Sequence, residues 1–126
     1  MKKIFTFIIL SILLSSFTAL PGIEEIVIAL KGGNVAEVSK FFDTSVEITI
    51  SDKSERYNKS QAEAVLRNFF NSNPISGFTI IHQGENAGAY YCIGTLNTRN
   101  ASYRTTVYMK LNGDKQSLKE IRFENR

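Results

Sequence analysis

The chain has 126 residues and a formal net charge of +3, and a single domain is expected because domains usually run to about 100–200 residues. Its only cysteine, Cys92, excludes an intrachain disulfide, and its only histidine, His82, excludes a histidine-rich metal site. Basic residues near the C-terminus are interspersed with acids, so no clustered basic face points to nucleic acid as a partner.

The first twenty residues have the layout of a secretory signal peptide. Lys2 and Lys3 precede an apolar run, IFTFIILSILL, which small and polar residues follow. A permanent anchor fits less well, because a spanning helix needs about 20 predominantly apolar residues and polar residues interrupt this stretch. We therefore expect cleavage of residues 1–20, export to the periplasm or the extracellular space, and no membrane contact afterwards. Cleavage would leave 13 basic and 12 acidic residues, a net charge of about +1.

Residues 21–126 are expected to form the single domain, and it begins with two short helices. The glycines after Lys31 suit the end of the first helix, and Asn34, with Glu37 three residues on, is placed to cap the second. Apolar residues recur at helical spacing in both segments. They are Ile23, Ile26, Val27 and Leu30 in the first, and Val35, Val38, Phe41 and Phe42 in the second.

A strand, a turn and a third helix are predicted next. SVEITIS alternates apolar and polar residues, as in a half-buried strand, and a short return strand begins at Arg56 and Tyr57. Ser60 is then placed to cap a helix through a capping box with Glu63. That helix ends at NSNP, since asparagine and proline both favour leaving a helix. Its apolar stripe consists of Ala62, Val65, Leu66, Phe69 and Phe70.

Four strand-like runs fill the rest of the chain, and short turns bearing glycine or asparagine separate them. Short connections join neighbouring strands, so these runs predict a four-stranded antiparallel meander. With the preceding elements they indicate an α+β fold in which the N-terminal helices pack on a mostly antiparallel sheet. The runs are FTIIHQG, AYYCIGTLNT, SYRTTVYMKL and SLKEIRFEN.

This order of elements resembles the cystatin-like cone of the nuclear transport factor 2-like superfamily. In that fold a strongly curved sheet wraps the helices and leaves a pocket at its open end. The stretches ALKGGNVAEVSKFF, YNKSQAEAVLRNFF, FTIIHQGENAGAYYCIGTL and YRTTVYMKL are most similar to a family of small exported bacterial proteins of unknown function within the superfamily. The resemblance covers nearly the whole of residues 21–126, and its motifs are mainly structural.

Catalytic members of the superfamily, such as steroid isomerases and scytalone dehydratase, place an Asp or His with tyrosines inside the cone. The resemblance therefore makes Asp43 and His82 the candidate acid–base residues. Asp43 also suits a helix-to-strand turn, which we favour. His82 shares its strand phase with Phe78 and Ile80, so we expect it to face the core or a cavity, with a structural role favoured. Neither a metal ion nor another cofactor is expected.

Aromatic side chains are the candidate lining of a pocket for a small apolar ligand. Tyr90 and Tyr91 must point to opposite faces of their strand, so at least one is expected on the concave side. The alternative is that tyrosine is simply a good strand residue with a hydrated tip. The candidate lining residues are Tyr57, Phe69, Phe70, His82, Tyr91 and Tyr103.

These features predict an exported, non-catalytic binding or interaction module. One alternative is a small-molecule lyase, isomerase or hydrolase that uses His82 or Asp43. Another is a purely structural homodimer that pairs through the outer strand face. A cone filled by Phe41, Phe42, Phe69 and Phe70 would weaken the ligand and enzyme hypotheses, whereas a cavity of at least roughly 300 Å³ on His82 or Asp43 would support an enzyme.

Overall fold

A computed structural model describes residues 22–126, so the predicted signal peptide lies outside the described residues. Within this range no helix is long and apolar enough to cross a membrane. The elements are, in chain order, α2 (Ile23–Lys31), α3 (Val35–Ser39), β1 (Phe42–Ile50), β2 (Lys53–Asn58), α4 (Lys59–Ser72), β3 (Ile75–Asn86), β4 (Ala89–Thr98), β5 (Ser102–Asn112) and β6 (Lys115–Asn125).

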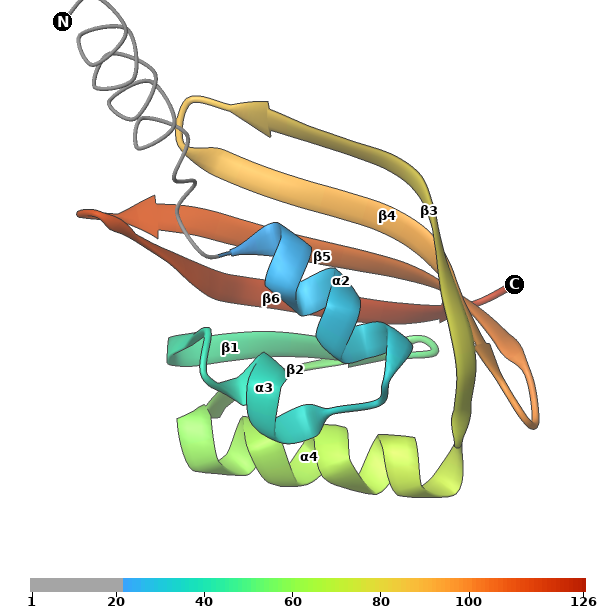
Figure 1. The fold of residues 1–126 in the computed structure, drawn as a ribbon. Helices are drawn as coiled ribbons and strands as arrows, with labels where there is room; N and C mark the ends of the chain where they lie inside the picture. The colour runs from blue at the N-terminus through green and yellow to red at the C-terminus, as the bar shows by residue number, and fades with distance from the viewer. Residues whose placement is uncertain (1–21) are drawn as a thin grey trace, which may run out of the picture.

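The six strands form one sheet in the order β2-β1-β6-β5-β4-β3. The predicted meander from β3 to β6 is confirmed, because each strand pairs antiparallel with the next. Strand β1 joins the other side of β6 as a parallel neighbour, and β2 returns antiparallel beside it. All three helices lie on one side of this sheet, and the long β3 bends strongly around them (Figure 1). The predicted α+β class is thereby confirmed.

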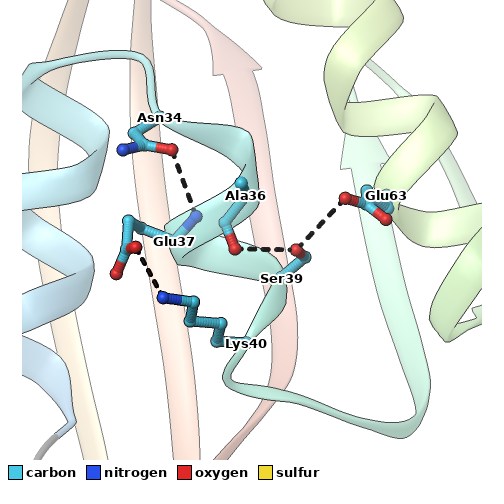
Figure 2. A network of polar contacts seen from close by, with 6 residues as sticks. All are labelled: Asn34, Ala36, Glu37, Ser39, Lys40 and Glu63. Atoms are coloured by element: carbon cyan, nitrogen blue, oxygen red, sulfur yellow. Dashed lines mark hydrogen bonds and ion pairs between the residues drawn. The ribbon is translucent and has the colours of Figure 1, made fainter.

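Helix α3 begins and ends on polar contacts (Figure 2). The predicted cap is present, since the Asn34 side chain accepts a hydrogen bond of 3.2 Å from the Glu37 amide. The Glu37 carboxylate pairs with Lys40 at 2.7 Å. At the other end the Ser39 hydroxyl donates toward Glu63 of α4 at 3.4 Å, so a side-chain contact connects the two helices.

The residue that caps helix α4 lies two positions earlier than the predicted Ser60. Strand β2 continues through Asn58, and this residue caps the helix: its side chain accepts from the Gln61 amide at 2.9 Å, and Gln61 accepts from the Asn58 amide at 3.3 Å. Asparagine caps helices as well as serine does, so the earlier residue takes the role. Glu63 is left free of the capping box and pairs with Arg67 at 2.9 Å.

Strand β1 likewise begins earlier than predicted, at Phe42 rather than in the SVEITIS run. The amide of Leu118 donates to the carbonyl of Phe41 at 2.6 Å, so the chain has already joined the sheet at this point. The prediction that Phe41 and Phe42 belong to the second helix is therefore wrong. Tertiary hydrogen bonding to β6 decides the conformation of these two residues.

The core lies between the helices and the inner face of the sheet. At its centre is an aromatic cluster, defined here as Phe69, Phe70, Tyr103 and Phe123. The Phe69 ring stacks on Phe123 at 4.6 Å and meets Tyr103 edge-on at 5.2 Å, and Phe70 meets Phe123 edge-on at 5.9 Å. Such arrangements are the favoured geometries of aromatic pairs. The rings therefore pack on one another across the interior of the cone.

Candidate functional site

The predicted pocket lining is largely core. Phe69, Phe70 and Tyr103 are 7%, 6% and 9% exposed, and the Tyr103 hydroxyl donates to Asn73 at 3.3 Å. Phe42 is also buried, and Phe41 packs partly buried against the hydrophobic core. The four phenylalanines whose burial weakens a cone-pocket hypothesis are therefore all packed. These side chains fill the interior.

Tyr57 lies at the edge of this core rather than inside it. It is the cross-strand partner of Val46, and its side chain packs partly buried against the hydrophobic core. Its hydroxyl donates to the Glu55 carboxylate at 2.8 Å. This hydrogen bond raises the pKa of the Tyr57 phenol and lowers the pKa of Glu55. The hydroxyl is thus held by a neighbouring residue of the same strand.

His82 lies on the opposite face of the sheet from the one predicted. Ile80 pairs with Gly94 whereas His82 pairs with Ile93, because a β-bulge between them inserts one extra residue. One extra residue reverses the phase of every following side chain. The imidazole Nε2 lies 2.9 Å from the Tyr91 hydroxyl, so both predicted lining residues face away from the helices.

Asp43 is held in an ion pair. Its carboxylate contacts the ammonium of Lys119 on β6, and its side chain is only 14% exposed. The hydrogen bond from Lys119, together with one from the Thr44 backbone, holds the pKa of Asp43 below its ordinary value. Asp43 therefore stays ionised at neutral pH and connects β1 to β6, instead of acting as a free acid in the cone.

The outer face of the sheet carries a row of polar side chains that crosses four strands. Arg56 on β2 is the direct partner of Glu47, Glu47 is the partner of Glu120 on β6, and Glu120 is the partner of Tyr108 on β5. Neighbouring strands lie about 4.8 Å apart, so this row extends over roughly 14 Å. Helices cover only the other face, which leaves the row open to solvent.

A second bulge adds Lys119 to this row. The β5–β6 register shifts between Tyr108 and Met109. Leu118 and Ile121, three residues apart, are both fully buried, although a regular strand would send them to opposite faces. Lys119 and Glu120 lie between them and both line the outer surface. The bulge thus places two adjacent charged residues on the same side of the sheet.

These residues surround a hollow of about 290 Å³ on the outer face, called the charged hollow below. Its lining consists of Glu47, Arg56, Tyr108, Lys110, Lys119 and Glu120. Lys119 is paired with Asp43, but within residues 22–126 the other four charged groups form no ion pair shorter than 4.0 Å. The hollow therefore presents two carboxyl groups and two cations that are not paired with one another.

The Glu47–Glu120 pair brings two like charges together. Burial raises the pKa of Glu120 above its ordinary 4.5, and a hydrogen bond with Glu47 and the negative charge of Glu47 raise it further. Arg122 opposes the rise. The Glu120 carboxyl thus gains a proton more readily than an isolated glutamate does, because protonation relieves the repulsion between the pair.

Replacing Glu120 with glutamine tests this repulsion. Like charges directly opposite on neighbouring strands are destabilising, and cross-strand pair effects amount to about 0.2–1 kcal/mol. Because the folded-state pKa of Glu120 is raised, the contribution of Glu120 to stability is fully present below its unfolded pKa and is lost as the pH rises through the folded value. We therefore expect E120Q to be more stable than the native chain at neutral pH by this amount, with the gap closing in acid. Urea unfolding across a pH series measures it.

The matched control is E85Q, which alters an exposed glutamate on β3 outside the charged hollow. Its stability should follow that of the native chain at every pH. If the difference in unfolding free energy between E120Q and the native chain grew as the pH fell, the assigned repulsion would be contradicted.

Sequence reasoning gave a site role to none of the six residues around the charged hollow. It placed Glu47 on the polar phase of its strand, which is correct, but expected only exposure there. One local signal was available: the spacing of Leu118 and Ile121 breaks strand alternation and indicates a bulge. The pairing of Glu47 with Glu120 has no such signal, because the two residues are far apart along the chain.

Comparison with known proteins found one matching family and several similar structures. Residues 23–124 match the profile of a domain of unknown function (DUF4783). A DUF4783 family protein from Bacteroides ovatus superimposes with a TM-score of 0.81 at 28% identity, over 86% of this chain and 98% of that one. A second, from Bacteroides fragilis, gives 0.79 at 30% identity, over 84% and 100%. No curated protein matches the sequence.

A structural neighbour of low sequence identity shows the wider fold. An NTF-2 like protein of unknown function from Burkholderia xenovorans superimposes with a TM-score of 0.61 at 10% identity, over 82% of this chain and 80% of that one. At this identity the similarity concerns the fold alone. The predicted resemblance to the nuclear transport factor 2-like superfamily, and to a family of unknown function within it, is confirmed.

Proposed function

The chain belongs to the DUF4783 family, and we propose that it is an exported, non-catalytic binding module whose ligand site is the charged hollow rather than the interior of the cone. The observation that carries this proposal is a contrast between the two faces of the sheet. The inner face is filled by the aromatic cluster, whereas the outer face presents charges that are not paired with one another.

The arrangement of acid–base groups supports a binding role over a catalytic one. A general base must lie within about 2.6–3.2 Å of the proton that it removes, or reach it through one water. His82 lies on β3, four strands from Asp43 on β1, which is roughly 19 Å at the usual strand spacing. Asp43 is paired with Lys119. The two catalytic candidates from the sequence therefore do not converge on one reacting atom.

The sequence of the first twenty residues supports export. A basic start, an apolar run and a small polar segment are the three parts of a secretory signal peptide. The single cysteine is compatible with export. Cys92 is fully buried, and burial raises the pKa of its thiol, so the thiol is little reactive. The proposed module therefore needs no disulfide to persist outside the cytoplasm.

Native mass spectrometry of protein recovered from its own compartment tests this proposal. We expect a bound small molecule on the native chain and on the control E85Q, and its loss from the double variant E47Q/K110M, which removes one carboxylate and one cation from the charged hollow. A ligand that stays equally well bound to the double variant would contradict the site. A ligand-free homodimer would contradict the small-molecule proposal and favour pairing through the sheet.

A further inference from the structure

The carboxyl pair of the charged hollow is suited to an organic cation. Glu47 and Glu120 are direct neighbours, about 4.8 Å apart at the backbone, and have no cationic partner within 4.0 Å among residues 22–126. A cation placed between them would remove their mutual repulsion. No group of three or more potential metal ligands exists in the described part of the chain, so two carboxylates alone suit an ammonium group better than a metal ion.

One of the two unpaired cations of the hollow, Lys110, lies at a defined backbone distance from this pair. Lys110 lies on β5, two residues along from Tyr108, which is the direct partner of Glu120. Strand spacing and strand rise together put the backbone of Lys110 roughly 8 Å from that of Glu120. Lys110 forms no ion pair within residues 22–126, so its ammonium is available to an anionic group.

The space between the two charged ends has an aromatic wall. Tyr108 lines the hollow directly beside Glu120 and two residues along β5 from Lys110, and its cross-strand partner on β4 is Tyr91. Aromatic side chains offer a flat apolar surface with a polar tip, which suits the backbone and small side chains of a ligand. The wall therefore favours a short organic spacer between the two charges.

We propose that the charged hollow binds a zwitterion of the length of a free dipeptide, with its ammonium group between Glu47 and Glu120 and its carboxylate on Lys110. Two residues of extended chain span about 7 Å, comparable with the roughly 8 Å between the backbones of Glu120 and Lys110. A single amino acid spans only about 3.5 Å and matches this separation less well. This assignment names the ligand class for the site under Proposed function and rests on it.

The pH dependence of binding follows from the carboxyl pair. An incoming ammonium favours the ionised form of Glu120, whose pKa burial and Glu47 raise. Affinity should therefore fall as the pH is lowered through that raised pKa. The groups that face Glu120 are Glu47 on β1, Arg56 on β2, Tyr108 and Lys110 on β5, and Lys119, Arg122 and Glu124 on its own strand. Asp43 on β1 offsets the charge of Lys119.

An NMR titration of the isotope-labelled, exported chain with alanylalanine tests the ligand class. We expect saturable amide shifts confined to β1, β5 and β6 around Glu47, Lys110 and Glu120. The amino-acetylated dipeptide, the dipeptide amide and free alanine should each bind roughly tenfold more weakly, because each loses one charge-assisted contact. The variants E47Q and K110M should show a similar loss, whereas E85Q should bind like the native chain.

Two results would overturn the ligand class. Equal binding of the blocked and unblocked dipeptides would show that the charged ends are not recognised. The native chain could instead carry a ligand that E47Q/K110M loses, while alanylalanine causes no amide shifts. That result would refute the zwitterion as the ligand and leave the site intact. If that ligand also survives in E47Q/K110M, the site itself is wrong, so the two failures are distinguishable.

Discussion

Replacing Phe123 with alanine is expected to lower the free energy of unfolding by about 3–5 kcal/mol, the cost typical of a buried phenylalanine. Phe123 is fully buried and contacts both Phe69 and Phe70 in the aromatic cluster. Truncation removes its transfer free energy and leaves a cavity that the rigid rings around it cannot close. Such a loss is a large fraction of the 5–15 kcal/mol by which domains are usually stable. Urea unfolding measures it directly.

The control for this variant is Ile81→Ala on β3. Ile81 is 60% exposed, so its truncation should change stability by no more than about 0.5 kcal/mol. A loss below about 1 kcal/mol for the Phe123 variant would contradict the filled interior. It would mean that the rings are loosely packed, and it would return the cone to consideration as a ligand pocket.

Replacing Gly94 with alanine is expected to cost about 1–3 kcal/mol, in the range of overpacked cores. A Cβ at this position would lie 2.5 Å from Cζ of Phe78 and 2.6 Å from the carbonyl oxygen of Thr79. The second contact is with the backbone of the neighbouring strand, which cannot move without breaking the β3–β4 pairing. Gly94 therefore lets the Phe78 ring approach the backbone of β4 closely.

The matched control is Gly77→Ala, two strand residues away from Thr79 on β3. A Cβ at Gly77 would meet nothing within 4 Å. Alanine there should be neutral or stabilise the chain by up to about 1 kcal/mol, since it restricts the unfolded chain. Thermal unfolding of the two variants compares them. Equal stability would contradict the close approach of Phe78 to the backbone of β4.

The overall fold was accessible from local patterns. Alternation in β1, at Val46, Ile48 and Ile50, and the turn-separated runs after Gly77 predict strands whose apolar faces are indeed buried. The Asn34 cap and the apolar stripe of α4 predict helices in the right places. These features depend on residues within a few positions of one another, and short-range periodicity determines them.

The orientation of His82 was not accessible, because it depends on a bulge. Strand periodicity places His82 with Phe78 and Ile80, but the extra residue before His82 turns it to the outer face beside Tyr91. A bulge reverses every later side chain in its strand, and apolar alternation alone does not reveal where it falls when Ile80 and Ile81 are equally apolar.

The charged hollow was inaccessible for a different reason. It depends on the parallel register that brings Glu47 of β1 beside Glu120 of β6. The local sequence predicts an ordinary polar strand residue at each glutamate, and it gives no sign that Lys110 and Arg56 are more than solvated surface residues. Only the strand order of the sheet, with β1 inserted between β2 and β6, makes these residues neighbours.

The location of a bound ligand tests the central claim most directly. Amide shifts should be recorded for the isotope-labelled chain, with and without the small molecule recovered from its native compartment. The account predicts shifts around Glu47, Tyr108, Lys110 and Glu120 on the outer face, with the aromatic cluster unchanged. Shifts concentrated on Phe69, Phe70, Tyr103 and Phe123 would contradict it and would place the ligand inside the cone.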